Sequence, residues 1–203
     1  FTRPDALDKK VFGGIDATYA FSSTDIGSDP SRGMHFDLQT GFKSNLDDVE
    51  RSFGYVIPSV QFYNSLTNNR KLVLHTKVRG HFNIGEAFEF YQAAVLGANT
   101  GLRGYRTQRF SGQSALVLSA DLKYKLIKFK TGLLPLQLGV YGGYDYGRVW
   151  VDNDISNAWH DDFGGGLIIS AVDVISGQVG LFSSDDGLRF GVGCGWRFGF
   201  KSG

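Results

Sequence analysis

Apolar and polar residues alternate with a period of two along most of this chain. The pattern is clearest from Leu188 to Phe200, where every second residue is apolar and the residues between them are glycine or arginine. Successive side chains of a β-strand point to opposite faces, so this alternation predicts strands with one apolar face. About nine such strands are predicted, at residues 11–21, 34–43, 52–64, 71–83, 114–126, 134–150, 163–171, 176–182 and 188–200.

Two all-β architectures fit this alternation. In a soluble sandwich or ligand-binding barrel the apolar faces point inward, whereas in a transmembrane barrel they face lipid and the polar faces line a wet lumen. Several predicted strands reach about 11–13 residues or more, whereas soluble strands average about 5–6 and membrane-spanning strands need about 9–11. The bare glycines on the polar face of the last strand leave room inside a lumen but do not suit a soluble surface. The pattern favours the transmembrane barrel, with the soluble barrel as the alternative.

One long segment, residues 84–113, interrupts the strands. It exceeds the length of about 12–15 residues beyond which structureless loops are uncommon and usually functional. It also carries apolar and aromatic side chains that a solvated loop would not keep, among them Leu102, Tyr105 and Phe110. We therefore expect this loop to fold back and pack inside the barrel.

Composition narrows the choice of function. Lys and Arg total 21 against 20 Asp and Glu, so net charge gives no argument for nucleic-acid binding. Glycine (28) and aromatic residues (14%) are abundant, which suits many strands joined by tight turns. The single cysteine, Cys194, falls on the apolar face of the last strand, where we expect it to be inert.

Short motifs in the second half of the chain resemble the bacterial surface-antigen superfamily of outer-membrane barrels, which includes BamA, TamA and the two-partner-secretion transporters. The residues that match its loop-six signature are Leu102, Arg103, Gly104, Tyr105, Arg109, Phe110 and Gly112. Residues 144–150 (YDYGRVW) and 163–167 (FGGGL) resemble later strands of the family, and Trp196, Phe198 and Phe200 resemble its C-terminal signature. The resemblance covers about residues 71–200, and the order and spacing of the motifs make it specific.

The resemblance implies an all-β fold: an antiparallel transmembrane β-barrel with a long infolded extracellular loop, in the outer membrane of a Gram-negative bacterium. In that family the loop arginine pairs with an acidic residue on the lumen wall. Here the arginine is Arg103, and Asp145 is the expected partner because it lies on the polar face of its strand between Gly143 and Gly147. Without the resemblance, Arg103 would pass for an ordinary exposed loop residue.

The chain also departs from the family pattern. The family's barrel has about 16 strands, and an intact barrel needs an even number, so we expect residues 1–203 to be its C-terminal portion, preceded by at least one strand and by roughly seven in a full barrel. Lys201, Ser202 and Gly203 follow the aromatic residue on which family members usually end. Residues 83–92 resemble a Bacteroidetes-type subgroup, some of whose members fuse the barrel to a metallophosphoesterase, but no phosphoesterase metal motif occurs here.

Other polar clusters have plainer interpretations. His75 and His81 share a strand face with Lys77 and Arg79, and nearby cations oppose metal binding, so a wet lumen wall is the better interpretation. Residues 160–162 (HDD) invite a metal site, but consecutive strand residues alternate sides, and a loop edge is preferred. The aspartates of the predicted turns, such as Asp25 and Asp29, are ordinary turn residues. No catalytic, metal or cofactor site is predicted.

Two functions follow from these expectations. The first is a non-enzymatic factor of BamA/TamA type for assembly, insertion or secretion, whose partners are outer-membrane lipid, unfolded outer-membrane proteins or subunits of an outer-membrane complex. The second is a barrel that anchors an upstream enzyme, such as a phosphoesterase or a patatin-like lipase. A soluble β-barrel binding module is a weaker third. The residues preceding Phe1 in the intact protein would decide between the first two.

Overall fold

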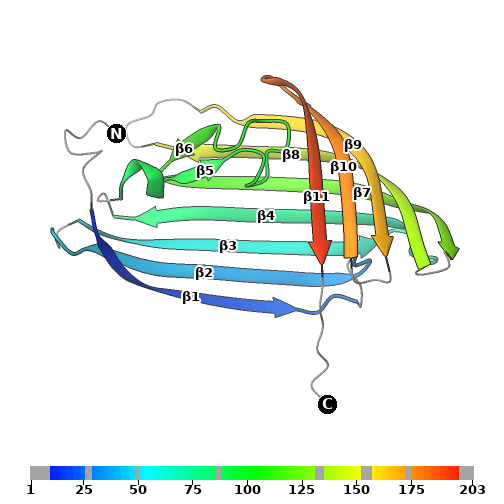
Figure 1. The fold of residues 1–203 in the computed structure, drawn as a ribbon, viewed down its shortest axis with the longest axis horizontal. Helices are drawn as coiled ribbons and strands as arrows, with labels where there is room; N and C mark the ends of the chain where they lie inside the picture. Colours follow the sequence, from blue (N-terminus) through cyan, green and yellow to red (C-terminus); the bar gives the residue numbers. More distant parts are fainter. Residues whose placement is uncertain are drawn as a thin grey trace, which may run out of the picture.

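A computed structural model describes residues 10–25, 29–48, 51–85, 88–130, 135–151, 157–171 and 175–196. Nine long strands form one antiparallel sheet in the order β1-β2-β3-β4-β7-β8-β9-β10-β11, so neighbours in space are neighbours along the chain except where the long loop intervenes. The sheet curls, so that β10 and β11 cross in front of β3 and β4 in the view of Figure 1. The strands are β1 (Phe12–Ser22), β2 (Gly33–Asn45), β3 (Ser52–Ser65), β4 (Leu72–Ile84), β7 (Ser114–Lys130), β8 (Pro135–Trp150), β9 (His160–Ala171), β10 (Ile175–Ser184) and β11 (Gly187–Trp196).

The two faces of the sheet differ as the alternation predicts. Large apolar side chains are exposed over the whole convex face, for example Ile15 at 80%, Phe163 at 62% and Val192 at 71%. The cross-strand pairs keep this face continuous, because Val78 of β4 pairs with Leu118 of β7, which pairs with Tyr146 of β8. Such a face suits lipid contact and the polar concave face a lumen, so the fold is that of part of an outer-membrane β-barrel.

Strand β7 is longer than expected, and its alternation changes near its end. The pairing of β7 with β8 shifts between Lys125 and Ile127, where a bulge inserts one residue. Beyond it, Ile127 pairs with Leu138 and Phe129 with Leu136, so these apolar residues continue the outer face. A period-two reading that stops at residue 126 misses this extension because a bulge reverses the parity of the residues that follow it.

The sheet ends at β1 on one side and β11 on the other. Within the described residues neither edge strand pairs with a further strand, and the sheet does not close on itself. Trp196 is the last residue of β11, while Phe198 and Phe200 lie outside the described residues. Among the described residues, no helix is long and apolar enough to cross a membrane.

The long segment after β4 lies on the concave side of the sheet (Figure 1) and is not structureless. It contains a short 3₁₀ turn, Phe90–Gln92, and two three-residue strands, β5 (Ala94–Leu96) and β6 (Phe110–Gly112), which pair antiparallel. Its buried apolar side chains form two clusters with the sheet. Ala94, Leu96, Leu102 and Tyr105 pack with Ala115 and Val117 of β7, and Phe88 and Ala93 pack with Phe53 of β3. The loop is thus infolded as predicted, and apolar packing against β7 holds it there.

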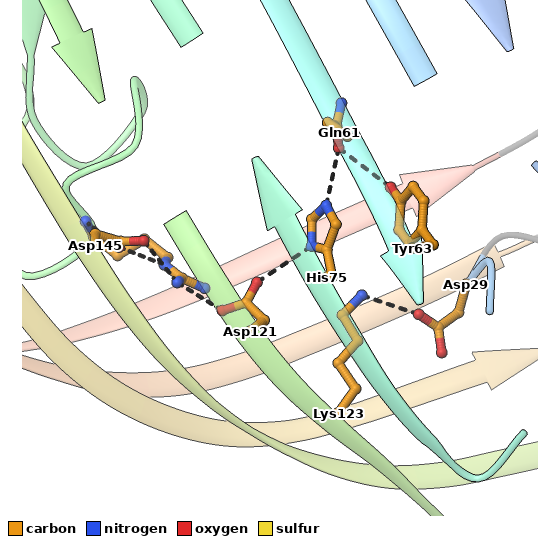
Figure 2. Close-up of polar contacts among 8 residues, drawn as sticks. Asp29, Gln61, Tyr63, His75, Asp121, Lys123 and Asp145 are labelled. Carbon is orange, nitrogen blue, oxygen red and sulfur yellow. Dashed lines mark hydrogen bonds and ion pairs between the residues drawn. The ribbon is translucent and has the colours of Figure 1, made fainter. Parts of the chain in front are cut away.

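The turn between β1 and β2 also reaches across the concave side. The Asp29 carboxylate lies 3.0 Å from Lys123 Nζ (Figure 2) and 3.6 Å from Lys125 Nζ, and both lysines are on β7. Asp25 accepts hydrogen bonds from the backbone and hydroxyl of Ser31 and lies 3.7 Å from Arg70. Asp25 therefore stabilises the turn itself, whereas Asp29 connects the turn to β7.

Candidate functional site

Arg103 lies at the tip of the infolded loop and meets two aspartates of the wall, Asp145 and Asp121, both labelled in Figure 2. Its Nε donates to Asp145 Oδ2 at 2.7 Å and its Nη2 to Asp145 Oδ1 at 2.8 Å, which is the two-pronged arrangement that a guanidinium favours. The backbone N–H of Arg103 donates to the same Asp145 Oδ2 at 3.2 Å. Nη2 also donates to Asp121 Oδ1 of β7 at 2.7 Å. The structure therefore has the predicted Arg103–Asp145 pair and adds Asp121, which sequence analysis missed.

Glycines make the room that this contact needs. A Cβ on Gly143 of β8 would lie 2.3 Å from Asp121 Oδ1 and 2.6 Å from Arg103 Nη2. A Cβ on Gly104 would lie 2.7 Å from the Cβ of Asp162 on β9. Glycine is therefore required at this position because the loop backbone lies so close to the wall. Gly104 lies in the expected turn, where the Tyr105 N–H donates to the Leu102 carbonyl at 3.2 Å, and Gly101 has a φ of 127° that suits glycine.

Side chains of β3 and β4 contact Asp121 on the side away from Arg103. His75 Nδ1 of β4 lies 3.5 Å from Asp121 Oδ2, and its other ring nitrogen lies 3.2 Å from Gln61 Oε1 of β3. The ring of Tyr63 stacks on His75 with centroids 4.5 Å apart. Figure 2 shows the polar chain from Gln61 through His75 to Asp121, and Asp121 in turn binds Arg103, so His75 is more than a solvated wall position.

Aromatic rings close the site on its other side. The Arg103 guanidinium lies 4.2 Å from the ring centroid of Phe182 on β10, a cation–π contact. Tyr105 is 1% exposed and donates from its hydroxyl to the Asp161 carbonyl at 3.1 Å. Phe110 stacks on His160 with centroids 3.7 Å apart. Through these rings the loop contacts β9 and β10 as well as β7 and β8.

The remaining residues of the loop motif have clear places. Leu102 is completely buried in the cluster on β7. A Cβ on Gly112 would lie 2.4 Å from the Trp150 carbonyl oxygen, so this glycine also permits close approach. Arg109 is half-exposed and donates to Asp186 Oδ2 at 2.7 Å in the β10–β11 turn. That hydrogen bond lowers the pKa of the Asp186 carboxyl below its ordinary value.

The polar residues considered as metal ligands are separated by strand geometry. Asp162 pairs with Asp145 and faces inward, whereas Asp161 pairs with Tyr146 on the outer face. Within the described ranges, no group of three or more His, Cys, Asp or Glu side chains is arranged to hold a metal ion.

The curved antiparallel sheet, its apolar outer face and the loop bound inside it define the class: an outer-membrane β-barrel protein. The sequence model of the haemolysin secretion/activation protein family ShlB/FhaC/HecB matches residues 23–171, and the chain belongs to this family. The family consists of outer-membrane transporters of Gram-negative bacteria, which is a secretion class and not an enzymatic one. A search of curated proteins gives no match. The predicted superfamily is supported, whereas the BamA/TamA branch and the phosphoesterase fusion are not what the match identifies.

Proposed function

We propose that this chain forms part of the wall and the internal plug of an outer-membrane transporter that secretes a polypeptide. The proposal is carried by one observation, the Arg103 tip bound to the lumen wall through Asp145 and Asp121, in a chain of a secretion family. Secretion fits a haemolysin secretion/activation family better than the BamA/TamA-type assembly expected from the sequence.

In this proposal the docked loop is a removable barrier. The loop occupies the concave side through apolar packing on β7 and through the ion pairs of its tip. A secreted chain can pass along the polar concave face only where the loop has moved away from it. The ion pairs at the tip contribute part of the free energy needed to undock the loop. The mechanism is non-enzymatic, because it needs binding and displacement and no bond is made or broken.

A second candidate is insertion of outer-membrane proteins, and one observation favours it. Added Cβ atoms at Gly177 of β10 and Gly191 of β11 would meet nothing within 4 Å, so packing does not require glycine there. Glycine weakens a strand and its pairing, and an edge strand released at such a seam could template a client strand by β-augmentation. The third function, an anchor for an upstream enzyme, stays a prediction for the residues that precede this chain.

Deleting the gene for the full-length protein separates these candidates. Secretion predicts that one or a few polypeptides disappear from the medium and collect in the periplasm, while the outer-membrane barrels keep their abundance. Insertion predicts the reverse, a loss of barrels from the outer membrane. If neither the medium nor the outer membrane changes, both proposals are wrong and the anchor is left.

A further inference from the structure

Asp162 is a buried carboxyl group that the Arg103 pairing does not use. Its side chain is 0% exposed, and within the described part of the chain neither carboxylate oxygen has a hydrogen-bond partner of normal geometry, apart from a weak contact with the backbone N–H of Gly104. It stands directly opposite Asp145 in the β8–β9 register, and its Cβ would lie 2.7 Å from a Cβ placed on Gly104. Asp162 therefore lies between the wall carboxylate that binds Arg103 and the backbone of the loop tip.

The charges around this position do not favour a third carboxylate. Asp145 and Asp121 already meet the single guanidinium of Arg103. His75 can add a positive charge beside Asp121, and Lys77 of β4 acts on Asp145, but within the described residues none of these cations forms an ion pair with Asp162. Directly opposed residues have Cβ atoms about 4.5–5.5 Å apart, so an ionised Asp162 would face the Asp145 carboxylate without a counter-ion. Burying an unpaired charge is costly, and like charges at such a distance discourage the second ionisation.

Asp145 has a free site for a donor. Its two oxygens accept three hydrogen bonds, all from Arg103, whereas an ionised carboxylate offers about four acceptor positions. A carboxylic acid opposite it supplies one O–H donor. The same O–H would give the Asp162 side chain a hydrogen bond of normal geometry, which it lacks within the described residues.

The geometry points to Asp162 as a proton-binding positioning residue: we infer that it is a neutral carboxylic acid in the docked state and that it donates its proton to Asp145. The inference rests on the proposed role of the loop as a plug, because it specifies what holds the tip against the wall. The proton comes from solvent when the loop docks. Loop docking is then coupled to proton uptake at a site other than the Arg103 ion pairs.

This coupling has a defined sign. A solvated aspartate is ionised at neutral pH, so undocking releases the proton and alkaline conditions weaken docking. Other titratable and charged groups around the site do not replace Asp162 as the proton carrier. They are His75 and Lys77 on β4, Asp121 on β7, Tyr141 and Asp145 on β8, Arg103 and Tyr105 on the loop, His160 on β9, and Asp185, Asp186 and Arg109 around the β10–β11 turn. Acid protonates the two partners of Arg103, so docking should also weaken at very low pH.

Asp162→Asn is the matched test, because an amide has the shape of the neutral acid and can donate to Asp145 at every pH. The full-length protein would carry a spin label at Thr107→Cys, an exposed loop position, in a Cys194→Ser background. With Asp162 present, the label should be immobile at neutral pH and become mobile as the pH rises. In Asp162→Asn it should stay immobile, with the alkaline transition lost. Asp161→Asn, one residue along on the outer face, should keep the transition of the parent.

Infrared spectroscopy gives a second readout that does not depend on the loop. At neutral pH the protein should show the carbonyl stretch of a protonated carboxylic acid, and Asp162→Asn should lose that band while Asp161→Asn keeps it. An unchanged band in Asp162→Asn, or an alkaline transition that persists in that variant, would overturn the inference. Neither readout measures secretion, so failure of this inference is distinct from failure of the proposed function.

Discussion

Two arginines of the same loop pair with aspartates at the same distance but in different surroundings. Arg103 Nε lies 2.7 Å from Asp145 Oδ2, and Arg109 Nε lies 2.7 Å from Asp186 Oδ2. At the tip the side chains are 21% and 0% exposed, with further hydrogen bonds to Asp145 and Asp121. The side chains of Arg109 and Asp186 are 46% and 21% exposed, and one hydrogen bond joins them.

The comparison teaches that distance alone does not measure an ion pair. Solvent screens the Arg109 pair, and such surface pairs contribute little. Water is largely excluded from the Arg103 pair, so removing Arg103 strands the buried Asp145 carboxylate, and removing Asp145 leaves the guanidinium with Asp121 alone. We therefore expect the same kind of substitution to have very different effects on loop docking at the two places.

The largest effect should come from Asp145→Ala. Removing one partner of a fully buried pair costs about 3–5 kcal/mol, and the partial exposure of Arg103 places the expected loss of docking free energy near the lower end. The mobility of a label on Thr107 measures docking, and heat-modifiable migration on a gel should show that the strands remain assembled. Arg103→Ala should behave alike, and the double variant should be little worse than either, because coupled residues are not additive. Additive losses would contradict the pairing.

Arg103→Lys should have an intermediate effect. Lysine keeps the charge but loses the planar fork that reaches both oxygens of Asp145 and Asp121 together, so we expect a docking loss of about 2 kcal/mol. The same label on Thr107 measures it. If docking is fully restored by lysine, charge alone suffices and the geometry described here is not needed.

Tyr105→Phe tests the tip without touching its charges. It removes the hydroxyl that donates to the Asp161 carbonyl and keeps the ring, so docking should weaken by about 1 kcal/mol. Tyr124→Phe, on the exposed outer face of β7, is the control and should leave docking unchanged. Equal effects of the two substitutions would mean that the hydroxyl of Tyr105 does not contribute to docking.

The smallest effect should come from Arg109→Ala, which we expect to leave docking unchanged within error. Because the pKa of Asp186 is lowered in the folded state, the small contribution of this pair is present above the ordinary aspartate value of about 3.9 and is lost as the pH falls through the lowered value. High salt should abolish it and spare the Arg103 pair. A docking loss in Arg109→Ala as large as in Asp145→Ala would remove the distinction between the two pairs.

Strand parity made the wall predictable from sequence. Asp145 could be assigned to the inner face because side chains alternate, and the family resemblance supplied Arg103 as its partner. Asp121 lies on the same inner face, but alternation along a strand shows only which face a side chain is on and not which residue it contacts. The contact of Asp121 with Arg103 depends on the position of the loop tip. Asp162 was placed at a loop edge, since nothing in the sequence shows that it faces Asp145.

The interior of the loop was harder to predict for a physical reason. Strands β5 and β6 have three residues each, too few for a period-two pattern to emerge. Apolar residues such as Leu102 indicated burial but not the partner surface. The bulge in β7 hid the extension to Lys130 in the same way, because it reverses the pattern that the prediction relies on.

The bond between Asp29 and Lys123 has a consequence for how the barrel assembles. Most strands pair with the next strand in sequence, so hairpins can form from local contacts early in folding. Asp29 and Lys123 are separated by 94 residues, and their contact requires β1 to β4 and β7 to be in place. Closing such a long segment carries an entropic cost, so this contact belongs among the last to form. The rate at which the Asp29–Lys123 contact forms would show when β1 to β4 and β7 have reached their final arrangement in the curved sheet.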